Sequence, residues 1–402
     1  MNNNLFDKIL NAKSLVGSIL VMLSLVCMWI YDKVNGDGNG IVAGISIEPL
    51  IKVSFVISVI LLVLLALLKK NKVAQNVLLS VVSILITFFI VEWFCGKWLD
   101  FQKTQQPEIS GPKHSFILDE NLGYKPAPNE ELVGLKTKAG EPVYNITFET
   151  DANSLRKIPL GFANATKFAK FYGCSMTFGE GVNSDETIPY QFAKLDSNFH
   201  VYNFAFSGYG PTQMLARLQD GNVKEIVNEN AGFAVYTFIP DHINRTINTY
   251  TNYSYNHGNV PCYKLIDDKL VRDGTFAESR RFRNFIFDQM AKSNTLRVFN
   301  IGYPFNITSE DYELTAAVFA ESAKEFEKKF QSKRFFIVIY PSNNDNSAMV
   351  ELLKSKGLRV LDYSKLFNPS DEGFAIPDDE HPTPKANQIL SAKLYEDIST
   401  MD

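Results

Sequence analysis

The chain has 402 residues, with 40 Lys or Arg and 44 Asp or Glu, so its formal net charge is −4. A chain of this length can hold two structural regions. The charged residues form no basic stripe, which argues against nucleic-acid binding.

Hydrophobic residues make up 46% of the chain and are concentrated in its first hundred positions. Three charge-poor apolar runs lie there, at residues 14–31, 53–68 and 73–91. The second run extends back to Pro49 if the Lys52 side chain reaches the interface. Each run approaches the length of about 20 residues that a helix needs to cross a bilayer. Three successive runs without a polar face favour membrane spans over core helices or a cleaved signal peptide, so residues 1–99 are expected to hold three transmembrane helices.

The lysines near these runs predict how the chain crosses the membrane. Lys8 and Lys13 precede the first run, and Lys69, Lys70 and Lys72 separate the second run from the third. The positive-inside rule therefore places the N-terminus and the second loop in the cytoplasm. The region that follows the third run is expected outside the cytoplasmic (inner) membrane, in the extracytoplasmic or periplasmic space.

The rest of the chain divides into two parts. Residues 100–165 are polar and proline-bearing, which predicts a linker and a peripheral segment. In residues 166–402, apolar runs typical of strands lie at 168–172, 201–206, 233–239, 335–340 and 358–361. Patterns typical of helices lie between them, at 211–227, 314–330, 347–356 and 384–398. This alternation predicts an α/β domain with a parallel sheet covered on both faces. Residues 243–310 are too long for an ordinary connection and are expected to form a lid or a substrate-binding insertion.

A candidate nucleophile follows the first of these strands. Ser175 comes after Gly173 and Cys174, at a strand-to-helix turn where a serine can expose its hydroxyl close to backbone N–H groups. Cys174 is an alternative nucleophile, but adjacent residues on a turn point in different directions. We therefore prefer Ser175.

A candidate base lies near the C-terminus. His381 follows three acidic residues, Asp378, Asp379 and Glu380, and precedes a helical pattern. A carboxylate can hold an imidazole in one tautomer while the other ring nitrogen faces a nucleophile. All three carboxylates compete for this role, and the spacing of three residues favours Asp378.

Donors for an oxyanion are expected at two further strand ends. Gly208 follows the second strand, and its N–H is a candidate together with the N–H of Ser175. The third strand ends near Asp241, His242 and Asn244. An ionised aspartate cannot donate a hydrogen bond, so His242, or Asn244 if the loop turns back, is the candidate there.

From about residue 167 to its end, the chain resembles the SGNH (GDSL-like) hydrolases. The segment around Gly173 and Ser175 is similar to the first block of that family, residues 203–208 to the second, and Asp378 with His381 to the last. The resemblance implies a three-layer α/β/α sandwich, with Ser175 as nucleophile and Asp378 and His381 completing a catalytic triad. Two positions depart from the family pattern. Cys174 replaces an aspartate that precedes the serine, and the third block lacks its usual asparagine, which leaves the oxyanion hole in question.

These features together predict a membrane-anchored extracytoplasmic serine esterase. Its expected substrate is an O-acyl ester, such as an O-acetyl ester, of an envelope glycan or lipid, and no metal or organic cofactor is required. Two alternatives stay open: an O-acyltransferase that acts on a glycan, and a non-catalytic glycan-binding or scaffold protein on a degenerate hydrolase fold. The sequence leaves the oligomeric state open.

Overall fold

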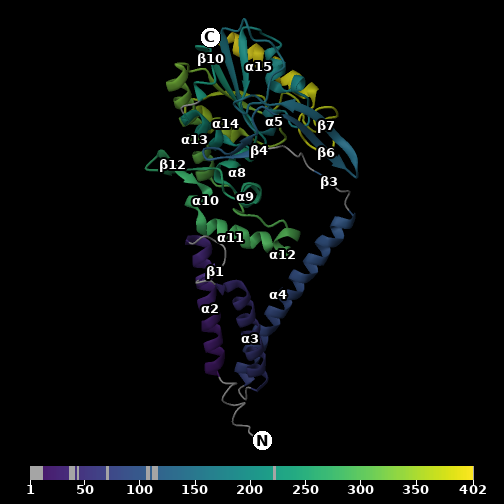
Figure 1. The fold of residues 1–402 in the computed structure, drawn as a ribbon, viewed down its shortest axis with the longest axis vertical. Coiled ribbons are helices and arrows are strands. Elements are labelled where there is room, and N and C mark those ends of the chain that lie inside the picture. The colour runs from purple at the N-terminus through teal and green to yellow at the C-terminus, as the bar shows by residue number, and fades with distance from the viewer. Residues whose placement is uncertain are drawn as a thin grey trace. The chain divides into compact units, whose positions relative to one another are not determined.

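The computed structural model describes residues 12–35, 41–42, 45–68, 72–105, 109–110, 116–220 and 223–401. The chain divides into two compact units. One unit contains the N-terminal helices, up to Gln105, together with Arg280–Ile301. The other contains Gln106–Ser279 and Gly302–Asp402, and some of its strands and helices are labelled in Figure 1.

The second unit is built on a parallel sheet of five strands in the order β14-β13-β10-β8-β9. The strands are β8 (Lys167–Tyr172), β9 (Phe199–Asn203), β10 (Ala231–Phe238), β13 (Phe335–Ile339) and β14 (Arg359–Asp362). In the register, Val235 of β10 lies between Phe171 of β8 and Phe336 of β13. All five strands match apolar runs in the sequence, so the predicted α/β class is confirmed.

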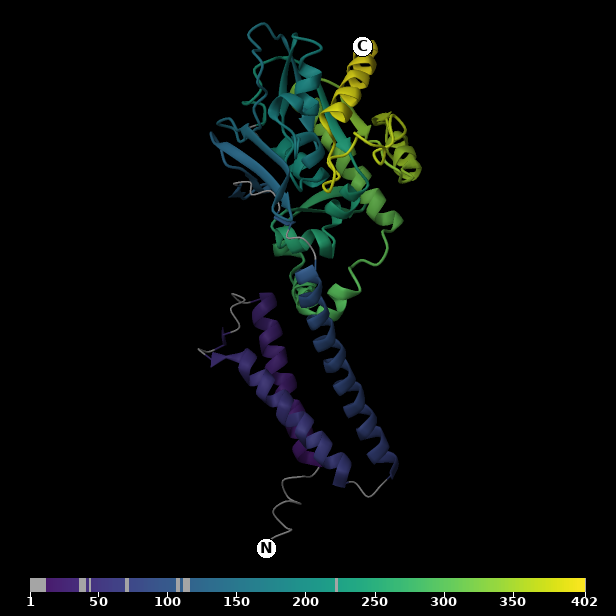
Figure 2. The same ribbon diagram turned by 90° about the vertical axis from the view of Figure 1, so that its right-hand side faces the viewer.

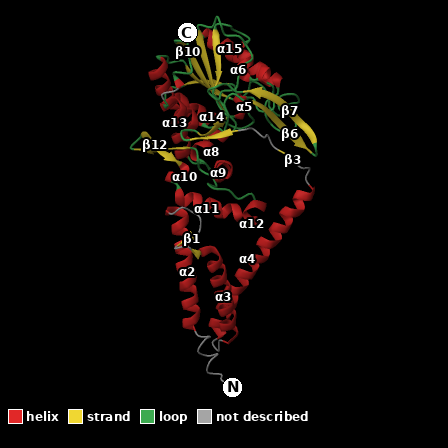
Figure 3. Cartoon of the chain, viewed as in Figure 1, coloured by secondary structure: helices red, strands yellow, loops and turns green. Residues whose placement is uncertain are grey.

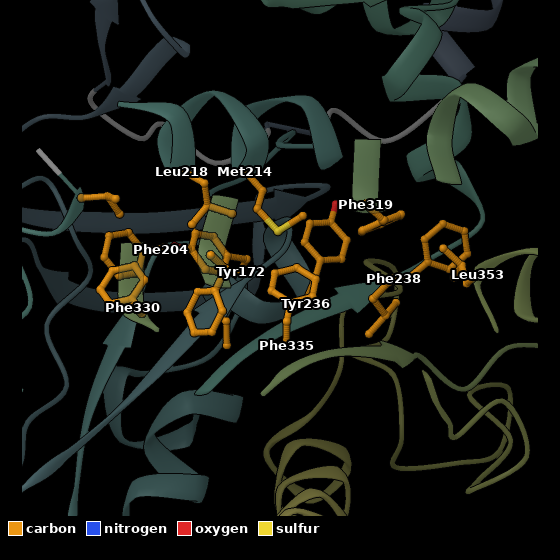
Figure 4. Close-up of a cluster of buried hydrophobic side chains, with 14 of the residues drawn as sticks. Tyr172, Phe204, Met214, Leu218, Tyr236, Phe238, Phe319, Phe330, Phe335 and Leu353 are labelled. Atoms are coloured by element: carbon orange, nitrogen blue, oxygen red, sulfur yellow. The ribbon is translucent and has the colours of Figure 1, made fainter. Parts of the chain in front are cut away.

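Side chains of the sheet alternate between two buried clusters, as the two-residue period of a strand requires. Tyr172, Tyr236 and Ile337 face one cluster, and Phe171, Val235 and Phe336 face the other. Figure 4 shows the first cluster. Helices α7 (Pro211–Gln219), α13 (Ser309–Phe330) and α14 (Ser347–Ser355) pack against the first cluster, and α6 (Ile188–Ala193) and α15 (Pro384–Thr400) against the second. The unit is therefore a three-layer sandwich.

The segment expected to be a linker and peripheral segment, residues 100–165, contains regular structure. It forms the hairpins β4 (Phe116–Asp119) with β5 (Gly123–Pro126), and β6 (Glu131–Lys138) with β7 (Glu141–Glu149), and the short strand β3 (Ile109–Ser110) pairs with β6. Figure 3 shows the long β6–β7 hairpin apart from the central sheet. Its buried side packs on the segment after β8, where Phe148 meets Phe178 at 5.2 Å between ring centroids.

The expected insertion, residues 243–310, is divided between the two units. The part in the α/β unit contains α8 (Asp241–Ile247), α9 (Tyr250–Asn256), β11 (Pro261–Ile266), β12 (Lys269–Thr275) and α10 (Phe276–Ser279). Arg280–Ile301 instead belongs with the N-terminal helices.

The N-terminal unit contains three helices, α2 (Ala12–Asn35), α3 (Ile47–Leu68) and α4 (Lys72–Gln105), and two short strands, β1 (Ile41–Val42) and β2 (Ile45–Ser46). Figure 2 shows the helices as a group. A hydrogen bond of 2.7 Å joins Ser18 of α2 to Ser58 of α3, and Phe55 of α3 meets Phe89 of α4 at 5.7 Å.

Two of these helices are long and apolar enough to cross a bilayer, where three were expected. The segments are Leu15–Asp32 of α2 and Gln75–Lys103 of α4, and only 11% and 6% of them are buried. Among the described residues of α3, the apolar stretch Pro49–Leu64 is shorter than these two segments. The α2 segment lies near the N-terminus, and its length and composition also suit a signal sequence. Lys8, Lys69 and Lys70, on which the predicted orientation depends, lie outside the described residues.

Candidate active site

Ser175 lies at the carboxyl end of β8, where the chain turns into α5 (Ser175–Phe178). The turn requires glycine at position 173, because φ is +149° there and a Cβ atom would lie 2.4 Å from Thr177 Oγ1. Cys174 is the N-cap of α5 and is completely buried, whereas Ser175 is partly exposed. Of the two adjacent nucleophiles, only the serine is accessible.

A buried arginine fixes the loop that follows α5. Arg156 donates hydrogen bonds to the carbonyl oxygens of Phe178 at 3.1 Å, Gly179 at 2.7 Å and Val182 at 2.8 Å. Burial lowers the pKa of Arg156 to about 9 even though Glu180 acts in the opposite direction, so the side chain is still charged at neutral pH. Arg156 was not predicted as a site residue, because a single arginine in a polar stretch gives no signal of burial.

The carboxylate that contacts His381 is Asp379, not the expected Asp378. Asp379 Oδ1 is hydrogen-bonded to His381 Nδ1, and the Asp379 side chain is only 3% exposed. The Asp378 side chain is 49% exposed and forms an ion pair with Lys138. The physical reason is the backbone. φ is +62° at Asp378 and +71° at Glu380, so the segment does not form the single regular turn on which the three-residue spacing depended.

Lys136 completes this group from a distant part of the chain. Its Nζ lies 2.8 Å from Asp379 Oδ2, and it also donates to the Asp378 carbonyl at 2.9 Å. Lys136 belongs to β6, and its distance of 243 residues from Asp379 hid it from sequence analysis. Burial would raise the pKa of the Asp379 carboxyl, but His381 and Lys136 outweigh burial and lower this pKa to about 2.

This lowered pKa predicts a pH dependence of stability. The pKa of Asp379 is lower in the folded chain than its ordinary value of 3.8. Its contribution to the free energy of unfolding is therefore complete above about pH 4 and is lost as pH falls towards 2. The shift corresponds to about 2 kcal/mol. Urea unfolding of the wild type and of Asp379→Asn, followed by near-UV circular dichroism, should show a stability difference that narrows between pH 4 and pH 2. A difference that stays constant over this range would contradict the ion-pair assignment.

A cavity of about 1020 Å³ opens beside these residues, at the carboxyl ends of the strands. Met176 lines it next to Ser175, Asp241 lines it after β10, and Ser342 lines it after β13. Asp379 and Lys136 also line it. The cavity therefore connects the turn that carries Ser175 with the group that holds His381.

Met176 and Glu380, the neighbours of Ser175 and His381, line this cavity, and among the described residues Ser175 and His381 form no direct hydrogen bond. The two segments are nevertheless linked. Gly181, in the loop after α5, lies against Ile376, whose N–H donates to the His381 carbonyl at 2.8 Å. Catalytic hydrogen bonds are commonly long in the absence of substrate, so this geometry is compatible with a serine–histidine pair.

Gly208 follows β9 and has a left-handed backbone with φ of +79°. Its N–H donates no hydrogen bond to a residue in the described ranges, so it is available to a ligand. Tyr124 covers this turn, and its hydroxyl donates to the Ser207 carbonyl at 3.0 Å. A Cβ atom on Gly208 would lie 2.4 Å from that hydroxyl oxygen.

Gly208→Ala is expected to destabilise the α/β unit for two separable reasons. The left-handed backbone costs an alanine about 1–2 kcal/mol, and the methyl group collides with the Tyr124 hydroxyl. Tyr124→Phe removes the collision, and by itself it costs only the hydrogen bond to the Ser207 carbonyl. The double variant should therefore lose less stability than the sum of the two single variants in urea unfolding. Strict additivity would argue against the close contact.

His242 does not face the cavity, contrary to the expectation that it supplies an oxyanion donor. Its ring is completely buried in the core beside Tyr236 and Phe238, and the backbone N–H of Ile239 donates to its Nδ1 at 3.2 Å. Burial, together with the charge of Arg245, lowers the pKa of His242 well below its ordinary value, so the ring is neutral.

The third strand end instead presents an ion pair to the cavity. Asp241 accepts hydrogen bonds from Arg245 Nε at 2.7 Å and from Asn244 Nδ2 at 3.1 Å. Arg245 also donates to the Tyr209 carbonyl at 2.8 Å. Asn244, the alternative donor of the sequence analysis, is thus bound to Asp241. The expectation for His242 is thus wrong, and the roles of Ser175 N–H and Gly208 N–H stay predictions.

A buried acid lies behind the serine turn and was also missed by the sequence analysis. Glu180 accepts hydrogen bonds from Tyr144 of β7, at 3.1 Å, and from the Ser207 hydroxyl. It therefore joins the loop after α5 to the turn that carries Gly208. Its position in a glycine-rich stretch, Gly179–Gly181, was the available signal.

No family model and no curated protein matches the chain. Among solved structures, the acetyl xylan esterase Est2A from the rumen bacterium Butyrivibrio proteoclasticus matches at 14% identity over 63% of this chain and 67% of that chain, with a TM-score of 0.35. A family two carbohydrate esterase from Clostridium thermocellum matches at 11% identity over 61% and 67%, with a TM-score of 0.36. A putative lipolytic protein of the G-D-S-L family from Desulfitobacterium hafniense matches at 11% identity over 57% and 98%, with a TM-score of 0.31.

Proposed function

We propose that the protein is a membrane-anchored serine esterase that hydrolyses O-acyl esters of an envelope glycan or lipid outside the cytoplasmic membrane. The observation that carries the proposal is the group formed by His381, Asp379 and Lys136, which adjoins the same cavity as the turn of Ser175. A buried acid that holds a histidine beside an accessible serine is the arrangement that serine hydrolysis needs.

In the proposed reaction, Ser175 Oγ attacks the ester carbonyl carbon and His381 Nε2 accepts the hydroxyl proton. Asp379 binds Nδ1, which keeps the ring hydrogen there and leaves Nε2 free to accept. The C–O bond to the alcohol then breaks, and His381 returns the proton to the leaving alkoxide. Water, deprotonated by His381 Nε2, then attacks the acyl carbon. The bond from that carbon to Ser175 Oγ breaks, His381 returns the proton to Oγ, and the carboxylic acid leaves. The N–H groups of Ser175 and Gly208 stabilise the oxyanion in both steps.

Membrane attachment is proposed from the length and composition of α2 and α4. The lysines at residues 8, 13, 69, 70 and 72 favour an N-terminus in the cytoplasm and an α/β unit on the opposite side. In this compartment, acylated envelope glycans and lipids are the available esters. Opposite sides require an odd number of spans, so α3 is proposed as the third.

The proposal is tested with the full chain purified in detergent and p-nitrophenyl acetate as the acyl donor. Turnover should be lost in Ser175→Ala and in His381→Ala, and a fluorophosphonate should label Ser175. Turnover that is unchanged in both variants, or a label on another residue, would refute the assignment of Ser175 and His381 as nucleophile and base. No turnover and no label in the wild type would favour the glycan-binding alternative. With a labelled acyl donor and a glycan acceptor, labelled free acid supports hydrolysis and labelled glycan supports transfer.

A further inference from the structure

Arg280–Ile301 leaves the α/β unit and belongs to the unit of the N-terminal helices. It forms α11 (Arg281–Lys292) and α12 (Asn294–Val298), which are labelled in Figure 1. Phe285 of α11 packs edge-on against Trp29 of α2, with 5.4 Å between ring centroids. Lys292 lies over the same Trp29 ring at 5.8 Å. Trp29 is near the C-terminal end of the apolar segment Leu15–Asp32, so α11 is attached at one end of this candidate span.

The second attachment is made by Glu92 of α4. Its carboxylate accepts hydrogen bonds from the backbone N–H groups of Asn294 and Thr295, and from the hydroxyls of Ser293 at 3.1 Å and Thr295 at 2.7 Å. A single carboxylate thus satisfies the first N–H groups of α12. Glu92 lies in the C-terminal half of the apolar segment Gln75–Lys103. The segment is therefore fastened to both candidate membrane helices.

Large apolar side chains are left exposed on this fastened segment. Phe282 is 61% exposed and Phe299 is 65% exposed, and Ile286 lies one turn from Phe282 on the exposed surface of α11. Trp93 and Trp98 of α4 are exposed as well. Tryptophan and phenylalanine at the end of a membrane helix suit the boundary between hydrocarbon and headgroups, whereas in water these rings would stay unburied.

The charge of the segment differs from that of the chain. It carries five basic residues, at positions 280, 281, 283, 292 and 297, and one acidic residue, Asp288, which gives a net charge of +4 against −4 for the whole chain. Arg281, Lys292 and Arg297 are exposed. Basic side chains next to exposed apolar ones are the combination that binds anionic headgroups at a membrane surface.

We propose that α11 and α12 lie in the headgroup layer of the outer leaflet, with Phe282 and Phe299 in contact with acyl chains and the exposed basic residues bound to anionic lipid. The inference rests on the membrane anchoring proposed above. Its consequence concerns the α/β unit, which is joined to the membrane unit by chain connections after Gln105, after Ser279 and after Ile301. The α/β unit is then tethered to the membrane surface through α11 and α12 as well as through α4.

The test uses the full chain in nanodiscs of phosphatidylcholine and phosphatidylglycerol, with the photoreactive residue p-benzoylphenylalanine introduced at one position at a time. Phe282 and Phe299 are the test positions. Phe89, exposed on α4, reports a membrane helix, and Leu195, exposed in the α/β unit, is the control. We expect lipid adducts by mass spectrometry at Phe89, Phe282 and Phe299 and none at Leu195.

Lipid adducts at Phe89 without adducts at Phe282 and Phe299 would overturn the inference and leave the anchoring in place. Cross-links from Phe282 or Phe299 to a protein chain would also overturn it. The absence of adducts at Phe89 would refute the anchoring and the inference together, while the esterase assay would be unaffected. In the Arg281→Gln/Arg297→Gln variant, the ratio of phosphatidylglycerol to phosphatidylcholine among the adducts should fall about fivefold for each charge removed, and an unchanged ratio would refute the role of the basic residues.

Discussion

Asp379→Asn is expected to lower kcat about 10⁴-fold, whereas Asp378→Asn should change it by less than about twofold. The reason is that Asp379 holds His381 Nδ1, while Asp378 is exposed and pairs with Lys138. An asparagine at position 379 can present its amide N–H to Nδ1, which favours the wrong tautomer and places the ring hydrogen on Nε2. His381 could then no longer accept the proton of Ser175.

The two variants form a matched pair, because each replaces one oxygen by an amide nitrogen in adjacent residues. Asparagine also tolerates the left-handed backbone of position 378, where φ is +62°. The measurement is kcat with the activated ester, together with circular dichroism to show that both variants fold. An equal loss of kcat in the two variants, or a larger loss in Asp378→Asn, would contradict the assignment of Asp379 as the acid of the triad and favour Asp378.

Arg156→Met is expected to destabilise the α/β unit by about 3–5 kcal/mol, the range for removing one partner from a buried charged network. The guanidinium group donates to three carbonyl oxygens of the loop after α5, and it lies 4.6 Å from the Phe148 ring and 5.2 Å from the Phe178 ring. Methionine fills part of the volume but leaves those oxygens without their donor, and each such buried oxygen costs about 1–3 kcal/mol.

Lys157→Met is the matched control for this prediction. Lys157 is the next residue, and it forms an exposed ion pair with Glu149 at 2.7 Å. Exposed ion pairs contribute about 0–1 kcal/mol, so this variant should unfold close to the wild type. Comparing the two variants in urea unfolding distinguishes the loss of the buried Arg156 hydrogen bonds from the loss of one positive charge. Comparable unfolding midpoints for Arg156→Met and Lys157→Met would show that the loop is held by other contacts.

The sequence predicted the central sheet because each strand is a short run of apolar residues buried on both faces. The runs at residues 168–172 and 335–340 are examples, and the structure has strands at Lys167–Tyr172 and Phe335–Ile339. The β6–β7 hairpin was missed because the segment was assigned from its prolines and polar residues, although β7 alternates buried Tyr144, Ile146 and Phe148 with exposed polar residues. This hairpin supplies Lys136, so the acid–histidine group could not be completed from the sequence.

The sequence by itself determined the parallel α/β architecture, the serine turn at the end of the first strand and the acidic residues that precede His381. These features depend on periodicity and on neighbours within a few residues, which a sequence displays directly. Only the tertiary structure decided that Asp379 binds His381, that the His242 ring belongs to the core and that Arg280–Ile301 joins the N-terminal helices. Those outcomes depend on left-handed backbone angles and on contacts such as Lys136 to Asp379, across 243 residues, which are fixed only when distant segments pack together.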